Sequence, residues 1–110
     1  MNLSTNQQNY LYNDLKVTFY QCDFNKLIAQ VHEFITDETN VDLISKAIHL
    51  KAKALFELEH RNKALEVLND LAKSLKILKN ENYYYSLGSM YYADGKYQEA
   101  SNAFSKMLTF

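Results

Sequence analysis

The sequence of 110 residues contains no proline and only two glycines, Gly88 and Gly95. Sheet proteins of this size usually mark their turns with several of these residues, whereas helices exclude both from their interiors. The residues that recur in long uninterrupted segments are Leu, Ala, Lys, Glu and Gln, which are good helix formers. The near absence of turn-forming residues therefore predicts an all-helical chain.

Cysteine is also scarce, because Cys22 is the single one. One thiol excludes an intrachain disulfide and a cysteine-based zinc site within one copy, and it fits a reducing compartment. The chain does not open on a basic segment followed by an apolar run, and no stretch approaches the roughly 18 apolar residues that span a bilayer. These features predict a cytoplasmic protein that does not engage a membrane.

Neither sign of charge dominates, since 12 Lys and Arg stand against 13 Asp and Glu for a formal net charge of −1. Proteins that bind nucleic acid normally carry an excess of cationic side chains, so the balance argues against nucleic acid as a partner. An apolar fraction of 47% and an aromatic fraction of 14% are enough to build a core. The chain is therefore expected to fold as one small domain.

Apolar residues recur at steps of three and four in six separate segments, which is the spacing that lines one face of a helix. Short polar links at residues 21–23, 59–62 and 94–96 join the segments two by two. Links this brief force the two helices of a pair to lie antiparallel and side by side. The six predicted helices carry apolar stripes over residues 11–19, 24–35, 44–55, 64–75, 84–91 and 97–108.

Residues that favour helix ends lie between these stripes. Gly95 suits a helix C-terminus, where a left-handed residue without a side chain is favoured. Thr39 and Asp42 have the spacing of a capping box, which predicts the start of the third helix, and Asn80 is expected to cap the fifth.

The helix pairs form an internal repeat. Leu27, Ala64 and Ala100 fall at equivalent places, 37 and 36 residues apart. A period of roughly 34 to 40 residues built from one helix pair is typical of helical solenoids. The expected organisation is a flexible N-terminus at residues 1–7, then three repeats over residues 8–41, 42–80 and 81–110.

The third repeat has the most specific pattern: an aromatic residue, then Leu-Gly, then Tyr, then Gly-x-Tyr, then Ala and Phe. The residues concerned are Tyr84, Leu87, Gly88, Tyr91, Gly95, Tyr97, Ala100 and Phe104. The pattern resembles that of the tetratricopeptide repeat family. The resemblance implies three antiparallel helical hairpins stacked as a right-handed solenoid that binds other molecules and does not catalyse a reaction.

Small residues explain part of this pattern, because Gly88 and Ala100 let the two helices of the third repeat approach closely. The second repeat has Ala64 at the place of Ala100 and is a fair match. The first repeat is degenerate, since it carries leucine, at Leu15 and Leu27, in place of both small residues. Its helix pair is therefore expected to be wider or differently angled. The proline that the family places between repeats is absent.

No group of residues indicates an active site. The histidines His32, His49 and His60 lie in different segments, without the spacing that brings metal ligands onto one helix face. Cys22 falls in a predicted turn with no ordered base, which is typical of an ordinary thiol. Glu57 and Glu59 lie on different helix faces, where each is expected to be solvated. The sequence thus predicts no catalytic residue, no metal and no cofactor.

A binding surface is predicted instead, because the resemblance implies that the first helix of each pair lines a concave groove. The groove would be aromatic with cationic points and would take an extended or helical peptide, with Lys16 and Lys53 meeting its acidic groups. Two alternatives stay open: the aromatic residues pack between helices or against a second copy, and the lysines are plain solvated charge. The nine residues are Tyr12, Lys16, Phe19, His49, Lys53, Phe56, Tyr85, Ser89 and Tyr92.

The last predicted helix carries apolar residues to its end, namely Met107, Leu108 and Phe110. A solenoid needs a polar helix over its last face. These residues are therefore expected to contact either a following helix of a longer protein or a second copy in a homo-oligomer. Two further functions stay as alternatives: a peptide-sensing regulatory domain of a longer protein, and an RNA-binding helical repeat.

Overall fold

The computed structural model describes residues 4–36, 39–74 and 81–110. These residues form six α-helices and no strand, which confirms the all-helical prediction. No helix among them is both long and apolar enough to cross a membrane. The helices are α1 (Thr5–Tyr20), α2 (Phe24–Phe34), α3 (Val41–Glu57), α4 (Arg61–Ser74), α5 (Glu81–Ala93) and α6 (Tyr97–Met107).

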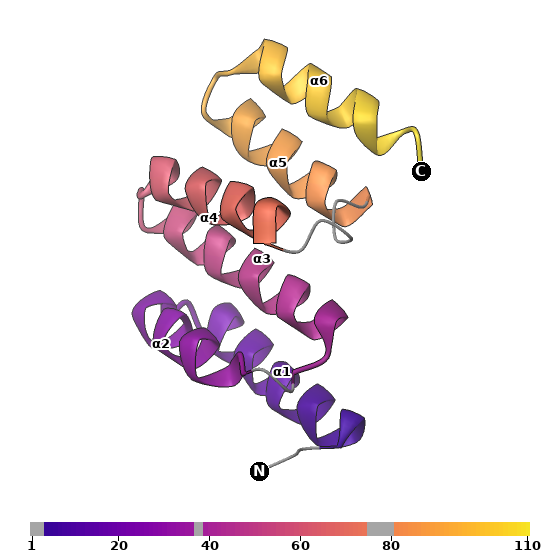
Figure 1. Ribbon diagram of the computed structural model, residues 1–110. Coiled ribbons are helices and arrows are strands. Elements are labelled where there is room, and N and C mark those ends of the chain that lie inside the picture. Colours follow the sequence, from indigo (N-terminus) through magenta and orange to yellow (C-terminus); the bar gives the residue numbers. More distant parts are fainter. Residues whose placement is uncertain (1–3, 37–38, 75–80) are drawn as a thin grey trace.

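The helices follow one another in chain order along the long axis of the molecule, with α1 and α2 at one end and α6 at the other (Figure 1). The second helix of each pair packs against the first. Helix α3 also contacts both α1 and α2, and α5 contacts both α3 and α4. The result is an elongated body with extents of 44 × 29 × 19 Å.

Helix α1 begins at a capping box. The Ser4 hydroxyl accepts a hydrogen bond from the Gln7 N–H at 3.2 Å, and the Gln7 side-chain oxygen accepts one from the Ser4 N–H at 2.8 Å. Because these bonds satisfy two donors that the first helical turn leaves without a backbone partner, the helix is stable from Thr5 onward. It therefore starts before residue 8, where the first repeat was expected to begin, and residues 1–3 lie outside the described residues.

The capping box predicted at Thr39 is wrong, because the N-cap of α3 is Asn40. Its side-chain oxygen accepts from the Asp42 N–H at 2.9 Å. The Thr39 hydroxyl is used elsewhere: it accepts from the Thr36 N–H and donates to the Phe34 carbonyl, which closes the end of α2. The other predicted cap, Asn80, lies outside the described residues.

The links inside the three pairs each contain one residue with a positive φ. Gly95 has a φ of 78°, as expected for a left-handed residue at a helix end, and Cys22 and Glu59 have φ values of 60° and 65°. Residues with a Cβ rarely adopt this region, at a cost of roughly 1–2 kcal/mol each. The three residues are 37 and 36 positions apart, so the sequence period is repeated in the backbone of the links.

The core consists of two clusters that meet at α3. One joins α3 to α1 and α2, and the other joins α3 to α4 and α5. Because α3 contributes residues to both clusters, it is buried on two sides. The first cluster contains Leu15, Leu27, Val31, Ala47, Leu50 and Ala54, and the second contains Ala52, Leu55, Ala64, Leu65, Leu68, Tyr83 and Met90.

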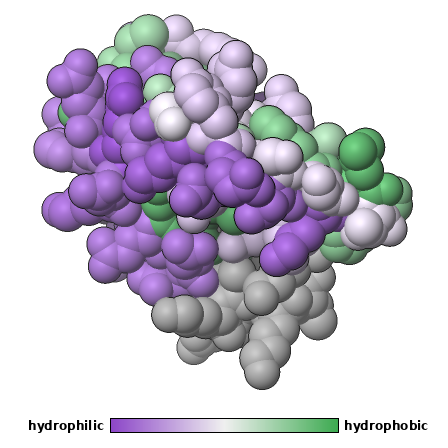
Figure 2. Space-filling model, turned by 90° about the horizontal axis from the view of Figure 1, so that it is seen from above, coloured by the Kyte–Doolittle hydropathy of each residue, from purple (hydrophilic) through white to green (hydrophobic). Residues whose placement is uncertain are grey.

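Helix α6 covers α5 and turns a polar face outward, and the end of the molecule that it forms is mostly hydrophilic (Figure 2). Its small residues Ala100 and Ala103 are buried. Large apolar residues are exposed only around its two ends, at Tyr97, Leu108 and Phe110, among the described residues after residue 92. The exposed residues within the helix are polar apart from Tyr97: Gln98, Glu99, Ser101, Asn102, Ser105 and Lys106.

Candidate functional site

A pocket of about 170 Å³ lies between α3 and α5, and we call it the α3–α5 pocket. Four of the nine residues predicted to bind a peptide line it, although they come from two helices that are separated along the chain. They lie together because Lys53 and Phe56 share one face of α3, Tyr85 and Ser89 share one face of α5, and the two helices are in contact. The full lining is Lys53, Phe56, Glu57, Tyr85, Ser86, Ser89 and Met90.

The pocket has an apolar floor and a charged rim. Met90 is buried in the second core cluster, and Phe56 is partly buried against the same cluster. Lys53 and Glu57 are exposed, and they lie four residues apart on α3. Tyr85 stands at the edge with 57% of its surface exposed. The pocket can therefore hold an apolar side chain while offering a cation and an anion at its mouth.

The Phe56 ring is held in place from outside the pocket. The guanidinium of Arg61 lies 5.0 Å from the ring centroid, a cation–π contact. Arg61 also pairs with Asp94 at 3.2 Å, and Asp94 lies 3.6 Å from the Lys96 ammonium. This group of charges joins the start of α4 to the link between α5 and α6. These charges therefore support the pocket at Phe56, the ring that Arg61 contacts.

His49 does not line the pocket. It is only 8% exposed, and its Nε2 atom is buried without a hydrogen-bond partner. Burial, together with the positive charge of Lys53, lowers the pKa of His49 to about 4. The side chain is thus neutral at pH 7 and part of the interior of the fold, which differs from the groove position that the sequence predicted for it.

The three predicted residues of the first repeat do not line the α3–α5 pocket either. Tyr12 and Phe19 pack against the first core cluster, and the Lys16 ammonium lies 5.4 Å from the Tyr12 ring centroid. Burial, and to a smaller extent the nearby Tyr20, raises the pKa of Tyr12 above its usual value. For these two aromatic residues the structure agrees with the alternative in which they pack within the fold.

The remaining predicted residues lie near α6. Tyr92 is 63% exposed and makes an edge contact with Tyr97, with ring centroids 5.3 Å apart. Phe110 stacks on Tyr84 at 5.8 Å, Leu108 is exposed, and Met107 is partly buried. None of them lines the α3–α5 pocket.

The sequence did not single out Glu57, Ser86 or Met90 as binding residues. Glu57 lies one helical turn after Lys53, so its place beside the pocket follows from the same spacing argument. Ser86 and Met90 are buried, and their role depends on where α3 and α5 meet, which no local pattern shows.

The described residues bring no group of three or more His, Cys, Asp or Glu side chains into an arrangement that would hold a metal ion. Cys22 is exposed, and its thiol donates a hydrogen bond to the Tyr20 carbonyl at 4.0 Å. The residues that line the α3–α5 pocket include no histidine.

Comparisons with protein-family models, with curated proteins and with solved structures found no match.

Proposed function

We propose that this chain is a non-catalytic protein-interaction module, built as a right-handed tetratricopeptide-like solenoid of three helical hairpins, and that it binds a peptide or protein segment in the α3–α5 pocket. The observation that carries the proposal is the meeting of Lys53, Phe56, Tyr85 and Ser89 around one pocket. These four residues belong to the nine that the resemblance to the tetratricopeptide repeat predicted from the sequence, and they come from two different repeats.

Two features of the fold support the solenoid. The first helix of the second and third pairs contacts both helices of the pair before it, as expected for hairpins stacked on one another. The left-handed residues Cys22, Glu59 and Gly95 recur with the period of the sequence repeat. Stacked units bury a continuous core between neighbours. The two clusters that meet at α3 have this character.

The chemistry of the pocket indicates what the bound segment carries. An apolar side chain would lie on Phe56 and Met90, where it displaces water from apolar surface. Next to it, a carboxylate or carbonyl of the segment would accept a hydrogen bond from the Lys53 ammonium. The exposed ring of Tyr85 would cover the segment, as aromatic residues do in many interfaces.

The test is selection of peptides from a displayed library, followed by titration calorimetry of one selected peptide against three proteins. Tyr85→Ala removes an exposed ring at the pocket. Tyr92→Ala removes a similarly exposed ring of the same helix that does not line the pocket. Truncation of an interface aromatic residue commonly weakens binding by roughly tenfold or more, so we expect this loss for Tyr85→Ala and unchanged binding for Tyr92→Ala.

Equal affinity of all three proteins would show that the pocket is not the binding site. A second copy of this chain is the alternative partner, since Leu108 and Phe110 are exposed. Light scattering after size exclusion distinguishes this case, because a homo-oligomer has a molar mass above 12.9 kDa in the absence of any peptide.

A further inference from the structure

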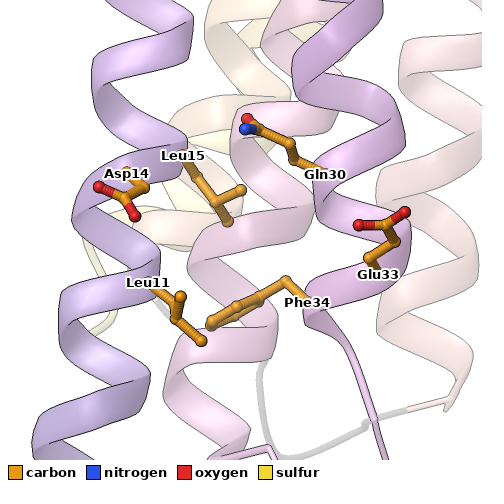
Figure 3. Close-up of a pocket in the computed structure, with 6 residues that line it drawn as sticks. All are labelled: Leu11, Asp14, Leu15, Gln30, Glu33 and Phe34. Carbon is orange, nitrogen blue, oxygen red and sulfur yellow. The ribbon is translucent and has the colours of Figure 1, made fainter.

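A second and larger pocket, of about 300 Å³, lies between the two helices of the first pair, and we call it the α1–α2 cleft. Figure 3 shows residues of α1 on one side and residues of α2 on the other. The cleft is separate from the α3–α5 pocket, since the two share no residue. Its lining consists of Leu11, Asp14, Leu15, Gln30, Glu33 and Phe34.

The middle of the cleft is apolar. Leu15 is buried at its back, and the side chains of Leu11 and Phe34 approach each other from opposite helices (Figure 3). Leu15 occupies the place that Gly88 has in the third repeat. This surface can cover a hydrocarbon chain, which gains free energy from leaving water.

The polar side chains that line the cleft are two carboxylates and one amide, with no cation among them. Asp14 and Glu33 are exposed on opposite sides of the cleft, and neither takes part in an ion pair among the described residues. Gln30 extends from α2 toward α1 (Figure 3), and its side-chain oxygen is buried without a hydrogen-bond partner. A buried oxygen of this kind is costly unless a donor reaches it.

We propose that the α1–α2 cleft binds a basic side chain, lysine or arginine, of a partner peptide. The hydrocarbon part of the side chain lies on Leu11, Leu15 and Phe34. Its cationic end lies between the carboxylates of Asp14 and Glu33 and donates a hydrogen bond to Gln30. The cleft thus complements such a side chain both in charge and in its apolar surface.

The form of the cleft favours a side chain over a free amine. Exposed ion pairs contribute little to binding, and the carboxylates of Asp14 and Glu33 lie at the surface. A free amine would gain only these contacts and the covered hydrocarbon. A peptide adds backbone contacts along the exposed flanks of α1 and α2.

The experiment is a titration of the ¹⁵N-labelled chain with lysine capped by an acetyl and a methylamide group, followed by NMR. We expect saturable shifts of the backbone amides at residues 11–15 and 30–34. Capped norleucine has the same hydrocarbon chain without the ammonium and should shift these amides much less. The double variant Asp14→Asn/Glu33→Gln should bind capped lysine roughly tenfold more weakly.

The matched control is Glu66→Gln/Asp70→Asn, which removes two exposed carboxylates of α4 and should leave the affinity unchanged. Circular dichroism checks that both double variants fold. The proposal is overturned if capped norleucine binds as well as capped lysine, if the α4 variant loses as much affinity as the cleft variant, or if the shifts lie elsewhere. Butylammonium, the side chain alone, is the remaining arm: affinity equal to that of capped lysine would identify a site for free amines and overturn the peptide assignment.

Discussion

The first and third helix pairs have links of the same length with a left-handed residue at the same place, Cys22 and Gly95, yet they pack differently. In the third pair, the Phe104 ring lies directly over Gly88, so closely that a Cβ atom at this position would be 2.7 Å from a ring carbon. In the first pair, Leu15 stands at the corresponding place, and a cleft of about 300 Å³ opens beside it.

The difference shows how few atoms decide the distance between two helices. The corresponding residues Leu15, Ala52 and Gly88 are all buried. Their side chains shrink from four carbons to one to none along the chain. A helix partner can approach only as far as the largest side chain at the crossing allows. The pair with leucine therefore keeps a cleft of about 300 Å³ between its helices, whereas the pair with glycine has a smaller pocket of about 210 Å³.

The largest expected effect comes from giving the third pair the residue of the first. Gly88→Leu places four carbons where one already contacts the Phe104 ring too closely, so α5 and α6 must separate. We expect a loss of about 3 kcal/mol in the free energy of unfolding, measured by urea denaturation. Ala93→Leu adds the same side chain at an exposed position of α5 and should change stability by less than about 0.5 kcal/mol. Equal midpoints for the two variants would show that α6 does not depend on close packing at Gly88.

A change of pH tests α3, on which both helices of the first pair pack. The folded chain holds His49 with a pKa of about 4, whereas the unfolded chain has the ordinary value of about 6.5. The unfolded state therefore binds a proton more readily between these values, and stability falls as the pH decreases through this range. We expect His49 to account for a loss of roughly 2 to 3 kcal/mol between pH 7 and pH 4.

The measurement is the free energy of unfolding of the wild type and of His49→Gln at a series of pH values. Other groups titrate in the same range in both proteins, so the difference between the two curves isolates His49. It should change between about pH 6.5 and pH 4 and be constant above this range. A difference that does not vary with pH would mean that His49 is solvated in the folded protein.

The helices could be predicted from the sequence because both the periodicity and the short links are local features. The N-cap of α3 could not be predicted from the sequence, because Thr39 and Asn40 are both good capping residues. Asn40 is the N-cap because the Thr39 hydroxyl is bonded to Phe34 and Thr36 at the end of α2. The left-handed conformation of Cys22 and Glu59 could not be predicted either, because glycine is the residue type that indicates this conformation in a sequence.

Part of the candidate site could also be predicted from the sequence, because helical spacing is a local feature. Lys53 and Phe56 share a helix face by spacing, and the repeat relates them to Tyr85 and Ser89. The repeat also selected His49, which the fold buries, because spacing shows the face of a helix but not the number of neighbours that cover it. For the first pair, the leucines indicated a wider or differently angled pair, but which residues line the cleft depends on the positions of both helices.

The smallest expected effect concerns the ion pairs formed at the link of the third pair and not at the link of the first. Asp94 pairs with Arg61 and Lys96, whereas Asp23, in the link of the first pair, forms no ion pair among the described residues and makes no capping bond to α2. Asp94→Asn should therefore lower the free energy of unfolding by about 0.5 to 1 kcal/mol at low salt, and Asp23→Asn by less. At about 1 M NaCl, where charges are screened within roughly 3 Å, the two variants should converge. Persistence of the Asp94→Asn effect at high salt would assign it to hydrogen bonding of the link and not to charge.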